Sequence, residues 1–569
     1  LTDDSNRPLD RTGTFTEGAV SLSFVPAWLD VRNDGMVLDY TPYKRNAAGQ
    51  SAADTGGTWT ELEPLQSGRY RYTFGTALDT TGHADRTHTF AMYGSRTFQG
   101  TSYVANVVKN FRPDGQPVTV TREIVTTQAC NGCHGTLKLH GGSRREVGLC
   151  ITCHNPGTID PDTGNSVDFK SLIHKLHRGA NLPSVLDGGV YEIIGFQGSV
   201  NDYSDVAFPR SIEDCQVCHQ GSTADQWKTH PTRAACTTCH DRTWFADANP
   251  PAGFTLHGQS WANANPTSTP PGPRTDDASC VTCHGPTGIF QVENVHSAPE
   301  LDTSHVLAVT IDPIAGQVAP GSQLSFTFHV TYDGQPRNLT AQPLSSLSAV
   351  LAGPNSDFVT MWGANPYTSA NMLTTGTLVA VDADAGVYNY TFPVASALPP
   401  SATGSYTVGM EGSVNAAQPR YAFMSPKQPF AVTDPTPVAR RRVIDSAKCN
   451  ACHGDLTFHG GARRGGEYCV MCHNPNNANN ERISRFESST VVAESVDFRV
   501  MIHKIHAGVN LSQPYIVYAF PAPTVANPAG TPTNFGETRY PRALNECEAC
   551  HLPGTWALPA APGRAPSIL

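Results

Sequence analysis

The sequence has little charge and no long apolar stretch. Only 15% of its 569 residues are charged, and no run of 18 apolar residues occurs, so no membrane-spanning helix is expected. The net charge of -10 argues against a nucleic-acid binder, which needs a basic face. A Gly-X-Y period is absent, which excludes collagen, and 39% hydrophobic residues exclude wholesale disorder. The opening LTDDSNRPLD lacks an apolar signal-peptide core, so a mature or trimmed chain is expected.

Cysteine is absent outside one repeated motif, C-x-x-C-H, which occurs eight times. The motif cysteines are Cys130, Cys133, Cys150, Cys153, Cys215, Cys218, Cys236, Cys239, Cys280, Cys283, Cys449, Cys452, Cys469, Cys472, Cys547 and Cys550. This is the attachment motif of c-type haem, in which two thiols form thioethers and the adjacent histidine ligates iron. A zinc site or a disulfide framework does not need a histidine after every second cysteine. We therefore expect eight covalent haems, and export through the periplasm, because this attachment happens outside the cytoplasm.

The second ligands of the irons are expected among the histidines outside the motifs. Eight of the 21 histidines close the motifs: His134, His154, His219, His240, His284, His453, His473 and His551. DFKSLIHKLHRG and DFRVMIHKIHAG have apolar residues at helical spacing, and each carries two histidines three positions apart. Ser166 or Asp168 can begin the first of these helices, and Gly179 can end it. One such helix can ligate two different haems.

The predicted distal ligands number eight, one for each motif. They are His140, His174, His177, His257, His296, His459, His503 and His506. His140 and His459 each follow a motif histidine by six residues, and His257 and His296 are chosen for the fourth and fifth motifs, with His230 and His305 in reserve. His83, His88 and His329 are interpreted as structural or surface residues. With imidazole on both faces, an iron has no open position, which favours electron transfer over catalysis, so no catalytic residue is predicted.

The chain contains an internal duplication. SGRYRYTF is repeated as AGVYNYTF, HTFAMYGS as YTVGMEGS, and CNGCHGTLKLHGGSRREVGLCITCHNP as CNACHGDLTFHGGARRGGEYCVMCHNP. The predicted fold is multidomain, with two β-sandwich or split-barrel modules (1–125 and 301–443) alternating with two loop-rich, haem-packed modules with short helices (126–300 with five haems, 444–569 with three). Counterparts of the fourth and fifth motifs would begin at or beyond residue 568, which favours a clipped chain over a natural eight-haem protein.

Two further groups of residues have less specific patterns. Asp382 and Asp384 leave a calcium site open, although acidic turns are common. Arg144, Arg145, Arg463 and Arg464 are expected to pair with haem propionates, because guanidinium binds carboxylate in a bidentate fork. Solvated arginines on a loop are the alternative.

The CxxCH-x5-HGG and CxxCHNP run and the IHKIHxG helix resemble the extracellular outer-membrane multihaem (decahaem) c-type cytochromes of the OmcA/MtrC type. The resemblance covers nearly the whole chain. It implies an electron-transfer protein at the outer-membrane surface, carrying electrons from a porin-cytochrome conduit to minerals, flavins or other cytochromes. Eight motifs stand where that family has ten, no cysteine lies between Cys283 and Cys449, and no N-terminal lipid-anchoring cysteine is visible.

Two alternative functions remain open at this point. One is a homopolymer that stacks terminal haems into a filament, and the other is a multihaem reductase of a nitrogen or sulfur oxyanion. The reductase needs a five-coordinate haem, whereas terminal reduction of metals by a conduit would be non-specific.

Overall fold

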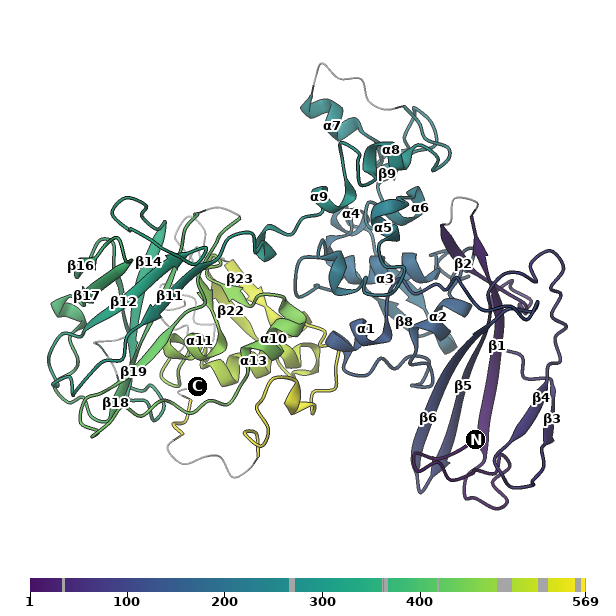
Figure 1. Ribbon diagram of the computed structural model, residues 1–569, viewed down its shortest axis with the longest axis horizontal. Helices are drawn as coiled ribbons and strands as arrows, with labels where there is room; N and C mark the ends of the chain where they lie inside the picture. Colours follow the sequence, from purple (N-terminus) through teal and green to yellow (C-terminus); the bar gives the residue numbers. More distant parts are fainter. Residues whose placement is uncertain are drawn as a thin grey trace. The chain divides into compact units, whose positions relative to one another are not determined.

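The computed structural model describes residues 1–32, 36–265, 272–360, 362, 367–416, 419–477, 494–519, 531–557 and 564–567. The chain divides into two compact units, Leu1–Ser297 and Ala298–Leu569. Each unit begins with strands and continues with short helices (Figure 1). The expected counterparts of the fourth and fifth motifs, at or beyond residue 568, lie outside the described residues.

The first unit begins with one four-stranded antiparallel sheet in the order β2-β1-β5-β6. Its strands are β1 (Val20–Val31), β2 (Val37–Pro42), β5 (His88–Phe98) and β6 (Thr101–Phe111). A separate hairpin of β3 (Thr58–Glu61) and β4 (Tyr70–Thr73) packs on it, with the Tyr72 ring stacked on Phe24 at 4.4 Å. The first β module is therefore smaller than a sandwich of two full sheets.

The helices of the first unit are short, and most of them surround the cysteine motifs. They are α1 (Thr127–His134), α2 (Val147–Cys153), α3 (Phe169–Arg178), α4 (Pro183–Leu186), α5 (Gln226–Thr229), α6 (Arg233–Cys236), α7 (Gln259–Ala264), α8 (Cys280–His284) and α9 (Val292–Val295). Two small strand pairs interrupt them, β7 (Glu192–Ile194) with β8 (Val200–Asp202) and β9 (Thr243–Trp244) with β10 (Thr255–Leu256). Helix α2 packs on the large sheet, because its Val147 and Ile151 share a core with Leu29 and Tyr40.

The second unit begins with two sheets that enclose one apolar core. One has the order β11-β12-β17-β16, with β13 beside β12, and the other has the order β15-β14-β18-β19. The strands are β11 (Leu307–Ile311), β12 (Ser325–Tyr332), β13 (Gln335–Pro336), β14 (Ser346–Ala352), β15 (Thr368–Asn371), β16 (Thr377–Asp382), β17 (Val387–Thr391), β18 (Ser405–Ser413) and β19 (Lys427–Ala431). Alternate residues of β12, such as Phe326 and Phe328, are buried, as the period-two pattern of its sequence predicts.

The rest of the second unit again holds short helices and small strand pairs. These are α10 (Ser446–His453), α11 (Gly466–Cys472), α13 (Phe498–Ala507), β20 (Thr457–Phe458) with β21 (Arg463–Arg464), and β22 (Ile516–Ala519) with β23 (Thr531–Asn534). Helix α11 packs on the β14-β18 sheet, because Tyr468 and Met471 share a cluster with Val350 and Phe358. The duplication thus repeats one packing arrangement, a motif helix against a sheet.

Candidate functional site

Each C-x-x-C-H motif occupies about one helical turn. The backbone N–H of the closing histidine donates to the carbonyl of the first cysteine at 2.9 to 3.0 Å in five motifs, for example from His154 to Cys150 and from His473 to Cys469. This turn brings positions i and i+3, the two cysteines, to the same side, with the histidine directly after them. None of the sixteen cysteines, all of which are described, forms a disulfide.

Every motif histidine faces one of the predicted distal histidines. The distances between ring centres are 6.1 Å for His134–His177, 5.9 Å for His140–His154, 6.2 Å for His174–His219, 6.0 Å for His240–His296, 6.0 Å for His257–His284, 6.2 Å for His453–His506, 6.0 Å for His459–His473 and 6.0 Å for His503–His551. Metal–nitrogen bonds of about 2.0–2.1 Å place two trans imidazole rings with centres roughly 6 Å apart. The spacing of all eight pairs therefore fits one metal centre between each two rings.

Hydrogen bonds at Nδ1 orient many of these rings. Nδ1 of His154 lies 2.7 Å from the Val167 carbonyl oxygen, and Nδ1 of His177 lies 2.8 Å from that of Ile173. The second unit repeats both contacts, from His473 to Val496 at 2.9 Å and from His506 to Ile502 at 2.8 Å. Because a carbonyl only accepts, Nδ1 carries the proton in each of these rings, and Nε2 keeps a lone pair for a metal.

Helices α3 and α13 each present two histidines to two different motifs. His174 and His177 on α3 face the third and first motifs, and His503 and His506 on α13 face the eighth and sixth. Asp168 is the N-cap residue of α3 and Gly179 its C-cap, as predicted. Burial lowers the pKa of His174 to about 4, with His219 and His177 adding to the shift, so this ring is neutral at neutral pH.

A left-handed turn positions the distal histidines that precede two glycines. His140 has a φ of 49° and is followed by Gly141 and Gly142, with φ of 71° and 84°. In the second unit His459 has a φ of 54°, and two glycines with φ of 80° and 83° follow it. The turn reverses the direction of the chain, and in the first unit Leu139 pairs with Arg144 across it. As a result His140 faces His154 of the second motif, and not His134 of the first motif, which precedes it by six residues.

The five remaining histidines have other partners. Nε2 of His88 lies 2.6 Å from the Tyr43 hydroxyl, which also contacts His83 at 3.2 Å, and His329 contacts Asp312 at 3.0 Å. The reserves are similarly occupied: His305 Nδ1 lies 2.7 Å from Asp333, and His230 Nδ1 lies 2.8 Å from the Thr229 hydroxyl.

The four arginines expected near propionates have partners within the protein. The guanidinium of Arg144 lies 4.0 Å over the Tyr93 ring. Arg145 donates to the Gly142 carbonyl at 2.9 Å, Arg463 pairs with Glu411 at 2.7 Å and Arg464 pairs with Asp455 at 2.8 Å. Contacts with Tyr93 and Glu411 were not anticipated from the sequence, because they join residues about 50 positions apart.

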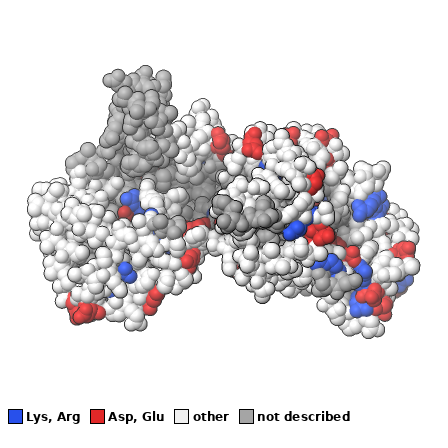
Figure 2. Space-filling model, turned by 90° about the horizontal axis from the view of Figure 1, so that it is seen from above, with Lys and Arg blue, Asp and Glu red and all other residues white. Residues whose placement is uncertain are grey.

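The carboxylates of the acidic turn considered for calcium accept hydrogen bonds from other groups of the protein. Asp382 accepts from the Ala385 N–H at 3.0 Å, and Asp384 accepts from the Asn338 amide at 3.3 Å. Among the described residues, no group of three or more His, Cys, Asp and Glu side chains is arranged to hold a metal ion. On the face shown in Figure 2, acidic and basic side chains are interspersed.

Comparisons with known proteins agree with this geometry. The model of the family "Outer membrane cytochrome MtrC/MtrF-like, domains II/IV" matches residues 122–297 and 441–564, more than half of the chain. The chain belongs to this family. It is thus a multihaem c-type cytochrome of the outer membrane, as the resemblance predicted, and the matched ranges contain all sixteen cysteines.

Two individual relatives of this cytochrome are informative. It is 26% identical over 249 residues to the multiheme cytochrome MtrC of Shewanella baltica (strain OS185), a match that covers 41% of this chain and 30% of the relative. The chain therefore spans less than a third of the length of that relative. The crystal structure of the outer membrane decaheme cytochrome OmcA has the same fold, with a TM-score of 0.58 and 19% identity over 89% of this chain and 78% of that one. In the described part of the cytochrome, no helix is long and apolar enough to cross a membrane.

Proposed function

We propose that this cytochrome is an extracellular electron-transfer conduit with eight covalent haems, each held between two histidines. The observation that carries the proposal is the set of eight histidine pairs, each a motif histidine and a distal histidine, with ring centres 5.9 to 6.2 Å apart. The haem irons supply one-electron redox chemistry. With haem bound, the paired histidines would hold the iron from both sides, which would leave no position for a substrate and argues against an oxyanion reductase.

Continuity of the motifs within each unit supports transfer from one motif to the next. In the first unit, Cys130 of the first motif packs against α2, the helix of the second motif, and α3 joins the first motif to the third. Nδ1 of His174, which faces the third motif, lies 3.1 Å from the Thr238 hydroxyl in the fourth. Arg233, beside the fourth motif, pairs with Asp277, beside the fifth, at 2.8 Å. These contacts support the order second, first, third, fourth, fifth.

The second unit shares the first part of this order. Lys448, beside the sixth motif, donates to the His551 carbonyl of the eighth at 2.7 Å, and the Gly466 N–H of α11, the helix of the seventh motif, donates to the Ser446 hydroxyl of α10 at 2.9 Å. The sixth motif thus lies between the seventh and the eighth, as the first lies between the second and the third. Helix α3 also joins the first and third motifs through its two histidines, and α13 joins the sixth and eighth in the same way.

The proposal extends to the organisation of the protein and its partners. The four divisions 1–125, 126–300, 301–443 and 444–569 are proposed as alternating β and haem modules. The five haems of the first unit are proposed to form one continuous wire, and so are the three haems of the second unit, because a conduit cannot contain an insulating gap one domain wide. Family membership supports an outer-membrane porin-cytochrome conduit as electron donor and minerals or flavins as acceptors.

Haem counting and spin-state spectroscopy test the proposal. Intact-chain mass spectrometry of the exported protein should show eight haems. Electron paramagnetic resonance of the oxidised protein should show only low-spin ferric iron, and a soluble flavin mixed with the reduced protein should take up electrons from its ferrous haems. Fewer than eight haems, or a high-spin site that binds carbon monoxide, would contradict the proposed arrangement. His83→Ala is the matched control for variants of the distal histidines, since His83 contacts Tyr43 and no motif histidine. It should leave every haem low-spin.

A further inference from the structure

The distal histidine of the third motif contacts a residue of the fourth motif. His174 on α3 faces His219 with ring centres 6.2 Å apart, and Nδ1 of His174 lies 3.1 Å from the Thr238 hydroxyl oxygen. Thr238 lies within the fourth motif, CTTCH, directly before Cys239, and it is only 2% exposed. The fourth motif therefore supplies a buried neighbour to a predicted ligand of the third.

The direction of this hydrogen bond follows from a shorter contact of the same hydroxyl. The Thr238 hydroxyl donates its single proton to the Ala235 carbonyl at 2.6 Å, because a carbonyl only accepts. The hydroxyl oxygen is then left as an acceptor for His174, whose Nδ1 carries the proton. Nε2 of His174 keeps its lone pair for a metal.

An aspartate directly after the fourth motif fixes that motif against α3. The Asp241 carboxylate accepts from the Ser184 hydroxyl at 2.6 Å and from the Ser184 N–H at 3.1 Å. Nζ of Lys175, on α3, lies 3.4 Å from the same carboxylate, and the Asp241 side chain is only 6% exposed. These contacts hold Thr238 beside the helix that carries its partner.

The other histidines of α3 and α13 have different surroundings at Nδ1. In His177 and His506 this atom lies 2.8 Å from a backbone carbonyl oxygen of its own helix. His503 occupies on α13 the position that His174 occupies on α3. It is exposed, and Nδ1 of His503 contacts no acceptor among the residues that the structure describes. The contact with Thr238 thus distinguishes the third site from the other three sites that these two helices serve.

We propose that Thr238 is a positioning residue for the third haem site, although it belongs to the motif of the fourth. By accepting the Nδ1 proton of His174 it fixes the plane of this ring and raises its basicity as an iron ligand. A more basic ligand stabilises ferric iron more than ferrous iron, so the contact lowers the reduction potential of the third site. The inference rests on the proposed function, since it requires haem at the third motif.

Substitution of Thr238 tests the inference in the full-length holoprotein. Thr238→Val keeps the shape of the side chain and removes the acceptor, so the potential of the third site should rise. The ratio of reduced to oxidised iron at a fixed potential should increase at least about threefold, which is about 28 mV at about 59 mV per tenfold change for one electron. Thr238→Ala also removes the acceptor and should shift the potential in the same direction. Thr238→Ser keeps the hydroxyl and should retain the unsubstituted potential.

Two spectroscopic readouts resolve the third site from the others. Redox titrations followed by nuclear magnetic resonance of the haem methyl groups give a potential for each site. His174→Ala identifies the third site, because loss of the distal ligand should leave that site high-spin. Electron paramagnetic resonance of the oxidised protein should show changed g values for the third site in Thr238→Val, because the plane of the His174 ring is no longer fixed. Thr238→Ser should restore them.

Thr237 offers a matched control within the same motif. Its hydroxyl donates to the Arg233 carbonyl at 2.9 Å and, within the described part of the chain, bonds no histidine. Thr237→Val therefore removes a hydroxyl-to-carbonyl bond from the same turn as Thr238→Val does, but leaves His174 its acceptor, so the third site should not shift. The first site is an internal control, because His177 lies on the same helix and a displaced α3 would shift both sites.

The outcomes distinguish the inference from the proposed function. A rise confined to the third site in Thr238→Val and Thr238→Ala, with Thr237→Val and Thr238→Ser unshifted, supports the inference. Eight low-spin haems with an unshifted third site, or with equal shifts in Thr237→Val or at the first site, would overturn the inference alone. A third motif without haem, or a third site that stays low-spin in His174→Ala, would overturn the proposed function and the inference together.

Discussion

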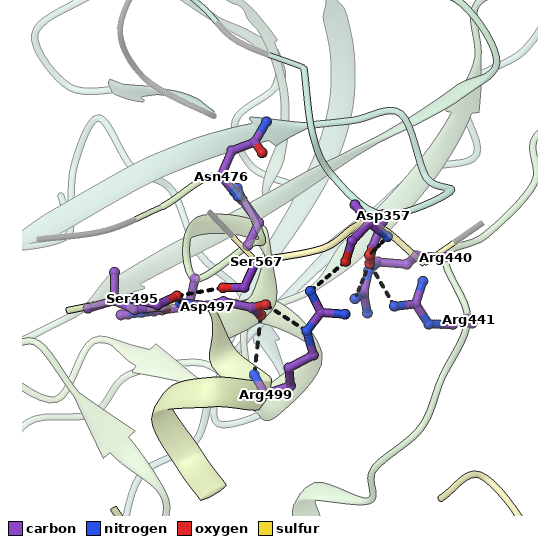
Figure 3. Close-up of polar contacts among 12 residues, drawn as sticks. Asp357, Arg440, Arg441, Asn476, Ser495, Asp497, Arg499 and Ser567 are labelled. Carbon is purple, nitrogen blue, oxygen red and sulfur yellow. Dashed lines mark hydrogen bonds and ion pairs between the residues drawn. The ribbon is translucent and has the colours of Figure 1, made fainter. Parts of the chain in front are cut away.

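Replacement of Asp357 by asparagine should destabilise the second unit more than most single substitutions. The carboxylate is buried and joins three segments, as Figure 3 shows. It pairs with Arg440 at 2.9 Å and Arg441 at 2.7 Å, at the end of the β-rich part, and it accepts from the Ala565 N–H at 2.7 Å. Arg499 on α13 donates to the Ala565 carbonyl at 2.6 Å. Asp357 thus connects the strands, a helix and the segment 564–567.

The magnitude follows from the burial of the two cations. Breaking a buried ion pair by removing one partner costs about 3–5 kcal/mol, because the other charge stays desolvated. The side chains of Arg440 and Arg441 are 16% and 25% exposed, so water screens part of that penalty. We expect Asp357→Asn to lower the free energy of unfolding by about 2–4 kcal/mol.

Hydrogen exchange in increasing urea, read on peptides of Ala298–Leu569, measures this loss separately from the first unit. Asp312→Asn is the control, because Asp312 forms a half-exposed pair with His329, and such pairs contribute about 0–1 kcal/mol. If Asp357→Asn costs no more than Asp312→Asn, the argument from buried charge is wrong.

Three further predictions concern the packing and titration of single residues. His506→Ala should turn one of the eight proposed haems high-spin, because His506 faces His453 with ring centres 6.2 Å apart, and electron paramagnetic resonance would detect it; an unchanged spectrum would refute the pairing. Gly409→Ala should cost about 1–3 kcal/mol in urea unfolding, because a Cβ there would lie 2.8 Å from the Tyr468 ring; full stability would contradict this. Burial lowers the pKa of His88 below its usual 6.5, so its contribution to stability is present above pH 6.5 and is lost as the pH falls through the lower folded value. Urea midpoints between pH 7.5 and 5 should therefore fall less steeply in His88→Gln, and equal slopes would exclude the effect.

The sequence selects histidines that the structure brings into pairs, but it does not indicate every pairing. The spacing of His174 and His177 on an amphipathic helix follows from local periodicity, and Asp168 and Gly179 bound that helix as expected. The partner of His140 depends on a left-handed turn through two glycines, which reverses the chain. His257 faces His284 of the fifth motif and not the histidine of the fourth. Tertiary packing decides this choice, and no local pattern indicates it.

The fold was predictable where alternation is strong. β12 and β17 follow the period-two patterns of QLSFTFHV and GVYNYTF, and their inward residues build the core of the second unit. In the first unit, the short hairpin β3-β4 and helix α2 pack on the large sheet. Local patterns indicate strands there, but they do not reveal how many strands share a sheet.

Duplication explains why histidine geometry and charge have diverged differently. Two rings that hold one metal tolerate little change in spacing, and the pairs His140–His154 and His459–His473 differ by only 0.1 Å between ring centres. The residues behind the motifs have diverged more, because Glu411, which accepts a hydrogen bond from the Tyr468 hydroxyl, occupies the position of Tyr93. The spacing of the paired rings is therefore the more strictly retained feature of the two repeats, as is expected if each pair of rings holds one metal.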